Sequence, residues 1–395
     1  MNLVCISKYC DDTTLKSVFK DNIFDGQAVT KFFRLLIEGL AAAGIQIRAI
    51  SSIPITRQNC KKLIIRERSI DSGDIKIEYP PVINIPVLKR LFTFLAVFFK
   101  CLLCKGGTTL LVDVLDASAG CGAVLAAKVR SFTSVGIITD MPEFQGISKS
   151  SVGLKINHFL VRLCDAYIFL TEQMNDYCNT AEKPYTVIEG FADTKEIMSQ
   201  LACGVKNRED KFICLYAGGL STKYGLDNLV KGFIKANLVN SELHIYGNGD
   251  YAKELLELAA ENQTVKFFGM RENKEVLEDE YSASLLINPR PAGDEYTKYS
   301  FPSKTLEYMS SGTPVLTTRL PGIPREYDDY LFYLDDVSIE GIASTITDIY
   351  NMPRDSIFAL GNKARMYVCK EKSNIKQAEK LVCFIKKLDA HGRTP

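Results

Sequence analysis

This 395-residue chain has no tryptophan, only three histidines, and no excess of either charge, since 48 lysines and arginines face 47 aspartates and glutamates. A net charge of +1 argues against a nucleic-acid-binding protein, which normally carries a basic excess. His158, His244 and His391 are far apart, and no histidine or cysteine spacing resembles a zinc site. We therefore expect neither a nucleic-acid partner nor a bound metal.

The twelve cysteines are scattered, mostly inside apolar segments, and do not form the spacing pattern of a disulfide framework. Cys101 and Cys104 have the spacing of a redox pair, but they lie in an apolar helical segment, which favours a structural role. Residues 1–10 lack the basic start and apolar run of a secretory signal. These features are typical of reduced, buried thiols in a cytoplasmic protein.

The chain also lacks an apolar run of the ~20 residues that a bilayer span requires. The strongest candidate, residues 91–99, is apolar apart from Thr93 and ends at Lys100. One interpretation is a core helix over residues 87–105. The other is a helix in the membrane interface, at the inner face of the cell membrane, because lysines and arginines flank it at Lys89, Arg90, Lys100 and Lys105.

Short β-branched or apolar runs alternate with helical patterns along nearly the whole chain, which predicts parallel sheets covered by helices on both faces. We expect strands at 3–7, 46–51, 109–114, 135–139, 167–170, 185–188, 212–216, 242–246, 265–268, 284–287 and 314–318, and an extra hairpin of 64–65 with 75–79. The predicted fold class is α/β, with two Rossmann-like, doubly wound domains facing a cleft.

A polar, weakly periodic stretch over residues 189–210 predicts a linker near residue 200. Residues 1–200 then form an N-terminal domain and residues 201–370 a C-terminal one. Residues 371–395 form a terminal helix, for which one arrangement is packing back on the N-terminal domain. In doubly wound sheets, ligands bind outside the carboxyl ends of the strands.

The most informative segment is residues 285–320, where a strand, a polar loop and a helix follow one another. Ser300 is placed to cap this helix, which we expect to start near Phe301-Pro302. Lys304 and Glu307 are three residues apart and so share a helical face. The lysine, the free amides of the first turn and the helix dipole suit a diphosphate, and Glu307 suits ribose hydroxyls. The alternative is an ordinary Lys–Glu pair on a surface helix.

Glycines follow two further strands. Gly218 and Gly219 come directly after residues 212–216, where they let the backbone approach a phosphate, and Lys223 adds a charge nearby. Gly247 begins a second glycine loop after residues 242–246. Each loop alone is weak evidence, because turns use glycine freely.

The ordered series YAGGLSTKYGLDNLV, LHIYGNGD, VKFFGM and FPSKTLEYMSSGTPVLTT resembles the donor-binding half of glycosyltransferase family 4 (group 1), of GT-B fold, as in bacterial capsule and exopolysaccharide sugar transferases. The resemblance implies a retaining, metal-independent transferase without a cofactor. Its substrate would be a nucleotide-sugar held mainly by the C-terminal domain, with the acceptor on the N-terminal one.

Some family positions differ here. The motif Glu-x7-Glu becomes Tyr299-x7-Glu307, so the implied ribose contact carries over to Glu307, while Tyr299 stands at the sugar-contacting position. Asp294 and Glu295, a few residues earlier, are candidates to compensate. In the family, an arginine follows the first glycine and a lysine precedes the next one. Here Gly219 occupies the arginine position and Tyr224 the lysine position, with Lys223 one place earlier. Lys304 is the candidate to take over part of the phosphate charge.

In the N-terminal half, Gly26 lies where relatives have a glycine loop facing the donor phosphates. Residues 135–140 resemble the family strand that ends in His-Asp, with Thr139 replacing the histidine and Asp140 kept. Asp140 is therefore the candidate to position or deprotonate the acceptor hydroxyl, and a capping aspartate is the alternative.

The resemblance thus implies a hexosyltransferase-type enzyme that moves a sugar from a nucleotide-sugar to a lipid-linked or growing polysaccharide. Asp140 and Lys304 are the catalytic candidates. Two alternatives remain: a GT-B nucleotide-sugar epimerase, and a catalytically degenerate scaffold in a polysaccharide assembly complex.

Overall fold

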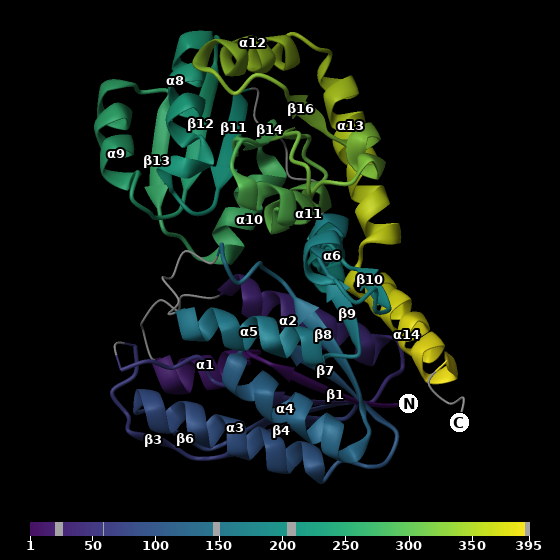
Figure 1. Cartoon of the computed structure of the whole chain (residues 1–395). Coiled ribbons are helices and arrows are strands. Elements are labelled where there is room, and N and C mark those ends of the chain that lie inside the picture. Colours follow the sequence, from purple (N-terminus) through teal and green to yellow (C-terminus); the bar gives the residue numbers. More distant parts are fainter. Residues whose placement is uncertain (20–26, 58, 145–150, 204–210, 392–395) are drawn as a thin grey trace. The chain divides into compact units, whose positions relative to one another are not determined.

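The computed structural model describes residues 1–19, 27–57, 59–144, 151–203 and 211–391 (Figure 1). The chain divides into two compact units. Unit 1 comprises Met1–Phe191 and Asn374–Pro395, and unit 2 comprises Ala192–Ser373. Each unit has its own parallel sheet and its own hydrophobic core.

Unit 1 contains an eight-stranded sheet of largely buried strands. They are β1 (Asn2–Ser7), β2 (Ile47–Ser51), β4 (Arg68–Ser72), β5 (Ile75–Tyr79), β7 (Thr108–Asp113), β8 (Thr133–Ile138), β9 (Ala166–Phe169) and β10 (Tyr185–Val187). Their order is β10-β9-β8-β7-β1-β2-β5-β4, and all neighbours are parallel except β4 and β5. The predicted hairpin turn is correct, but its strand partner is wrong. β5 pairs with β4, whereas β3 (Ile64–Ile65) pairs with β6 (Val82–Ile83), because the tight Ser72-Gly73 turn brings together only the strands that flank it.

The helices of unit 1 are α1 (Asp12–Phe19), α2 (Gln27–Ala42), α3 (Pro86–Leu102), α4 (Ala117–Arg130), α5 (Ser151–Leu163), α6 (Glu172–Cys178) and α14 (Asn374–His391). Helix α14, the C-terminal helix, packs on α2 and buries Ala378, Leu381 and Ile385 in the core. The two helices meet at Gly39, where a Cβ would lie 2.2 Å from the Asn374 carbonyl oxygen.

Unit 2 is an alternation of strands and helices. The strands are β11 (Phe212–Ala217), β12 (Ser241–Tyr246), β13 (Val265–Gly269), β14 (Leu285–Asn288), β15 (Val315–Thr318) and β16 (Phe332–Leu334). The helices are α7 (Thr194–Cys203), α8 (Leu226–Ala236), α9 (Ala252–Glu261), α10 (Asn273–Ser282), α11 (Ser303–Ser311), α12 (Ile339–Tyr350) and α13 (Arg354–Glu371), with 3-10 turns η1 (Thr222–Tyr224), η2 (Glu295–Tyr299) and η3 (Arg325–Tyr330). The six strands are all parallel, in the order β13-β12-β11-β14-β15-β16.

The strand order of unit 2 reverses between β11 and β14. The chain runs outward from β11 through β12 to β13, and then returns to place β14 on the other side of β11. In open parallel sheets, ligands bind beside such a switch point, outside the carboxyl ends of the strands. The loops after β11 and β14 are therefore where a site is expected.

The predicted α/β class, with two doubly wound sheets, is confirmed. Every predicted strand of the two sheets is present, with its ends within two residues of the expected ones, and the hydrophobic periodicity explains why. Parallel strands buried on both faces read as continuous apolar runs. The predicted linker region contains helix α7, and the units change over at residues 191/192 and 373/374.

Candidate functional site

The loops after β11 and β12 hold each other through backbone hydrogen bonds. The Gly218 amide donates to the Tyr246 carbonyl (3.1 Å), and the Leu220 amide donates to that of Asn248 (2.9 Å). Gly247 has φ +133°, and a Cβ there would lie 1.8 Å from the Gly218 carbonyl oxygen. Gly218 and Gly247 thus serve the packing of one loop on the other. Gly219 is exposed, and its amide has no partner in the described part of the chain.

Helix α11 begins later than the sequence suggests, and Ser300 does not cap it. Its N-cap is Pro302, whose carbonyl accepts from the Thr305 amide (2.8 Å) and which has no side-chain acceptor. Ser300 instead follows η2, because the extended Phe301-Pro302 backbone separates it from the helix. The amides of Ser303 and Lys304 have no acceptor within the helix, so they remain available to an anion.

Helix α11 is fixed to the end of β11 by the buried Tyr308. Its hydroxyl accepts from the Ala217 amide (2.8 Å) and donates to the Ala217 carbonyl (3.1 Å). These two bonds place the first turns of α11 beside the loop that starts at Gly218. The glycine loop and the helix of the predicted donor site are therefore brought together.

Lys304 is held by two carboxylates. Its ammonium forms an ion pair with Glu307 on the same helix, as the spacing predicts, and lies 3.4 Å from Glu280 Oε1 on α10. Burial alone would lower the pKa of Lys304, but the negative charges of Glu307 and Glu280 raise it above its ordinary value. The lysine is therefore permanently charged, and that charge is already matched by acidic partners.

Glu280 is a site residue that the motifs did not reveal. Its side chain is fully buried, and its backbone carbonyl accepts from Thr313 Oγ1 (2.8 Å). A signal was present, because Glu280 lies four residues after Val276 on the apolar face of α10. A buried carboxylate on such a face needs a cationic partner, and Lys304, whose side chain is 32% exposed, is one.

The other predicted donor-site residues of unit 2 are less enclosed. Lys223 is exposed in η1 and forms no ion pair with any described residue. Tyr299 is half-buried at the end of η2, whereas Asp294 and Glu295 at its start are exposed. The structure thus places all of them on the two loops that flank the switch point.

In unit 1, Asp140 is exposed in a bend directly after β8, and Gly26 lies outside the described residues. The switch point of this sheet lies between β1 and β7, where Asp113 ends β7. Asp113 is fully buried, and burial raises its pKa. It is a second acidic candidate, which its position inside an apolar strand pattern concealed.

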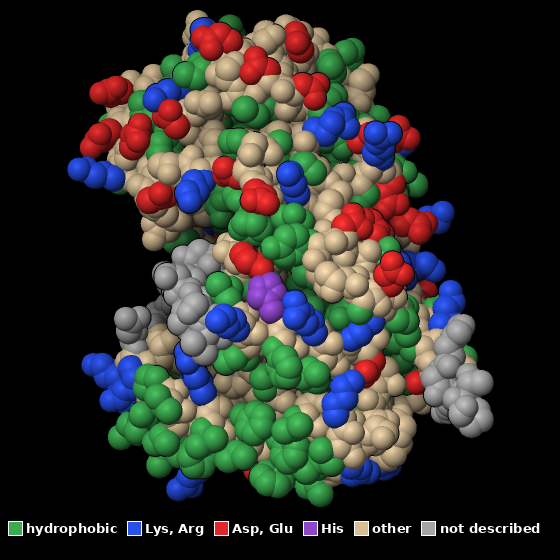
Figure 2. Space-filling model, in the orientation of Figure 1, with side chains coloured by type: hydrophobic (Ala, Val, Ile, Leu, Met, Phe, Trp, Pro, Cys, Tyr) green, Lys and Arg blue, Asp and Glu red, His purple; other side chains and the backbone are tan. Residues whose placement is uncertain are grey.

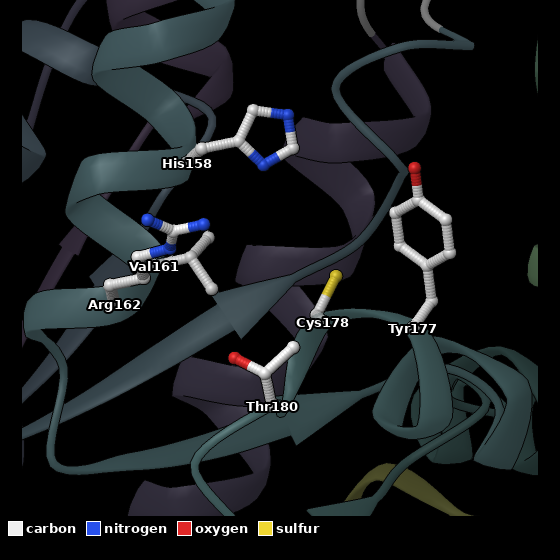
Figure 3. A pocket seen from close by; sticks show the side chains of 6 residues that line it. All are labelled: His158, Val161, Arg162, Tyr177, Cys178 and Thr180. Atoms are coloured by element: carbon white, nitrogen blue, oxygen red, sulfur yellow. The ribbon is translucent and has the colours of Figure 1, made fainter.

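Unit 1 also has a small hollow, lined by His158, Val161, Arg162, Tyr177, Cys178 and Thr180 (Figure 3). Side chains from α5 face residues at the end of α6. His158 Nε2 lies 2.7 Å from Glu143 Oε1, and burial raises the pKa of the Cys178 thiol to about 12. The thiol is therefore protonated at neutral pH and is a poor nucleophile.

Within the described ranges, His, Cys, Asp and Glu side chains form no cluster suited to a metal ion. None of the helices in these ranges is both long and apolar enough to cross a bilayer.

Residues 211–352, inside unit 2, match the family model described as "Glycosyl transferases group 1". The matched segment contains both loops at the switch point and the whole of α11. No curated protein matches the sequence significantly.

Solved structures match over nearly the whole chain. Sucrose-phosphate synthase from Thermosynechococcus elongatus has a TM-score of 0.69 at 15% identity, covering 99% of this chain and 100% of that one. The Anabaena protein HepE in complex with UDP has a TM-score of 0.64 at 15% identity, and the match covers 98% of this chain and 100% of that one. A UDP-forming α,α-trehalose-phosphate synthase from Burkholderia xenovorans has a TM-score of 0.66 at 10% identity, and the match covers 98% of this chain and 100% of that one. These similarities show the fold, which is GT-B as the motifs predict.

Proposed function

We propose that this chain is a retaining, metal-independent hexosyltransferase that uses a UDP-sugar, with unit 2 holding the donor and unit 1 the acceptor. The observation that carries the proposal is the position of the group 1 domain. Its glycine loop and the Lys304–Glu307 pair meet at the switch point of a doubly wound sheet. UDP is chosen because HepE, a structural neighbour, was solved in complex with it.

In the proposed reaction, the bond between the anomeric carbon and the diphosphate oxygen breaks, and a bond to the acceptor oxygen forms on the same face. The negative charge that develops on UDP is stabilised by the Gly219 amide, the first amides of α11, Lys304 and Lys223. Glu307 accepts from the ribose hydroxyls, and Ser300 and Tyr299 border the sugar. The acceptor hydroxyl gives its proton to Asp140 or to the departing phosphate.

The proposed acceptor is a lipid-linked or growing polysaccharide, as in capsule and exopolysaccharide synthesis, and the enzyme acts in the cytoplasm at the membrane surface. Support for the membrane comes from α3, whose exposed side chains form one apolar face, here called the α3 face, made of Leu88, Leu91, Phe92, Leu95, Phe99 and Leu103. Leu125 and Val129 of α4 extend it. Apolar side chains gather over these helices with lysines and arginines around them (Figure 2).

The proposal is tested by thermal shift with UDP-, GDP-, ADP- and TDP-sugars, because a bound donor stabilises the folded protein by mass action. Release of the nucleoside diphosphate in the presence of a lipid-linked acceptor then identifies a transferase. Isomerised donor without release identifies the epimerase, and donor binding without turnover identifies the scaffold.

Asp140 is tested by Asp140→Asn, which we expect to keep donor affinity and melting temperature but to lower the transfer rate roughly 10²-fold or more. Asp113→Asn is the matched variant at the other acidic candidate. An unchanged rate in Asp140→Asn would leave Asp140 with a capping role only.

A further inference from the structure

Arg290 is not among the residues that the motifs predict, yet it lies at the centre of the switch point. It follows β14 in the sequence Pro289-Arg290-Pro291, and its guanidinium carbon is 4.4 Å from the ring centroid of Tyr224. The two loops are packed on each other, because a Cβ on Gly225 would lie 2.5 Å from the Pro289 carbonyl oxygen. Arg290 therefore stands beside the glycine loop that follows β11.

The guanidinium has no acidic partner among the described residues. Its Nε is buried without a hydrogen-bond acceptor, and two other buried donors of the same loop, Asn288 Nδ2 and Tyr296 Oη, also have none. The Tyr296 ring lies 5.9 Å from the guanidinium carbon. Buried polar groups in folded proteins are nearly always hydrogen-bonded. Three unmatched groups that can all donate therefore favour an acceptor outside the described residues, and a ligand can supply it.

Two other cations near this edge of the sheet, Arg319 and Lys304, already have acidic partners, whereas Lys223 is unpaired among the described residues but exposed. Arg319, which follows β15, also stacks on a tyrosine, with 3.6 Å to the Tyr333 ring centroid, but its Nη1 lies 2.9 Å from Asp328 Oδ1. Lys304 is matched by Glu307 and Glu280. An incoming diphosphate thus finds at Arg290 a half-buried positive charge over the Tyr224 ring that no described carboxylate offsets.

The buried Tyr216 hydroxyl connects Arg290 with the predicted donor site. It donates to the Gly219 carbonyl oxygen (2.8 Å). Burial raises the pKa of this phenol, while the positive charges of Arg290 and Lys304 act in the opposite direction. The glycine loop and both cations therefore act on the same hydroxyl.

We propose that Arg290 is a diphosphate-binding residue of the donor site, oriented by stacking on Tyr224 and assisted by the donors of Asn288 and Tyr296. This inference rests on the proposed function. A guanidinium offers two parallel N–H donors to phosphate oxygens, and the planar stack fixes their direction before the ligand arrives. The loop after β14 then supplies a second positive charge beside Lys223 of the loop after β11.

The test compares UDP with uridine by titration calorimetry on the full chain. If the thermal-shift panel selects another base, that nucleoside diphosphate and its nucleoside replace them. We expect Arg290→Gln to weaken UDP binding roughly 10- to 100-fold and to leave uridine binding unchanged, because only UDP has the diphosphate. Arg319→Gln is the matched control, with the same residue type stacked on a tyrosine, and should leave both affinities unchanged.

Arg290→Lys is measured beside Arg290→Gln, because the glutamine removes both the charge and the stacked group. The lysine variant should bind UDP with an affinity between those of wild type and Arg290→Gln. Wild-type affinity for UDP in Arg290→Gln overturns the proposal, as does an equal loss for UDP and uridine, which identifies a structural role for the loop. A wild-type protein that binds no nucleoside diphosphate overturns the proposed function itself.

Discussion

At the scale of single residues, the two cations Lys304 and Arg290 have different surroundings. Lys304 contacts two carboxylates, those of Glu307 and the buried Glu280. Arg290 has the opposite arrangement, with its charge unmatched among the described residues. Such imbalance is costly unless a ligand or a further partner compensates it, which is why it marks a binding site more clearly than motif matching does.

The first residue-scale prediction concerns Lys304 and Glu307. Lys304→Ala should weaken UDP binding by roughly 10- to 150-fold and leave uridine binding little affected, because the lysine acts on the diphosphate. Glu307→Ala should weaken the binding of both UDP and uridine, because both ligands contain the ribose. Titration calorimetry with the two ligands measures this. If both variants bind UDP like wild type, α11 is not part of the donor site.

From sequence alone, neither change should unfold the protein, but Glu280 alters this expectation for the lysine. Lys304→Ala removes the ammonium that lies 3.4 Å from the buried Glu280 carboxylate and should lower the free energy of unfolding by ~1–3 kcal/mol. The double variant Lys304→Ala/Glu280→Gln should recover stability without recovering UDP affinity. Recovery of both would mean that Lys304 acts only on the fold.

The second residue-scale prediction concerns acid stability in unit 1. Glu78 accepts from Arg48 at 2.9 and 3.0 Å and from Lys100 at 2.8 Å. Burial opposes ionisation, but these partners lower the pKa of Glu78 from 4.5 to about 2. Because the folded-state pKa is the lower one, the stabilisation is complete above pH 4.5 and is lost as the pH falls toward 2.

At ~1.4 kcal/mol for each pKa unit, Glu78 contributes about 3 kcal/mol at neutral pH. Glu78→Gln should therefore be less stable than wild type at neutral pH by about this amount, and the gap should narrow near pH 3. Urea unfolding at the two pH values measures it. Glu379→Gln, in an exposed pair with Lys376, should show almost no effect at either pH. A gap that does not change with pH would contradict the assigned pKa.

At the scale of elements, the close packing of α3 on α4 decides which side chains of α3 are buried and leaves the α3 face exposed. A Cβ on Gly122 of α4 would lie 2.5 Å from the Phe94 carbonyl oxygen, so α3 and α4 are in near-backbone contact. Helix α3 turns Thr93, Val97 and Cys101 inward, and the larger aliphatic and aromatic side chains point outward. The sequence pattern of α3 is that of an amphipathic helix, but the neighbouring helix α4 decides which of its apolar residues are buried.

The element-scale prediction is that the α3 face binds anionic membranes. Wild-type protein should float with phosphatidylglycerol-containing vesicles at low salt and bind pure phosphatidylcholine vesicles less, because lysines and arginines border the face. Leu91→Ser/Phe99→Ser should lose this binding and stay folded, since both side chains are exposed. Met366→Ser, an equally exposed apolar position in unit 2, is the control. Wild-type protein that ignores anionic vesicles would refute the membrane role.

At the scale of the whole molecule, the chain passes from one unit to the other twice, at residues 191/192 and 373/374. The two crossing segments lie side by side, because Ala192 and Ser373 form a parallel bridge and the Ala192 amide donates to the Lys372 carbonyl (2.9 Å). The second crossing returns α14 to the core of unit 1. That unit is therefore completed only by the last segment of the chain.

The sequence by itself determined the fold class, most strands of the two sheets and the placement of Lys304 and Glu307 on one helical face. These depend on local rules: apolar runs for buried parallel strands, and a spacing of three residues for one helical face. The motif order likewise sufficed to indicate a group 1 glycosyltransferase domain. The roles of Asp140, Ser300 and Tyr299 remain predictions.

Only the tertiary structure decided which distant residues meet. Glu280 reaches Lys304 from another helix, Tyr308 fixes α11 to β11, and Arg290 stacks on Tyr224 from the far side of the switch point. Each contact joins segments separated by more than twenty residues, and its geometry depends on strand order. No local pattern specifies strand order, because parallel neighbours are selected by the packing of the whole sheet.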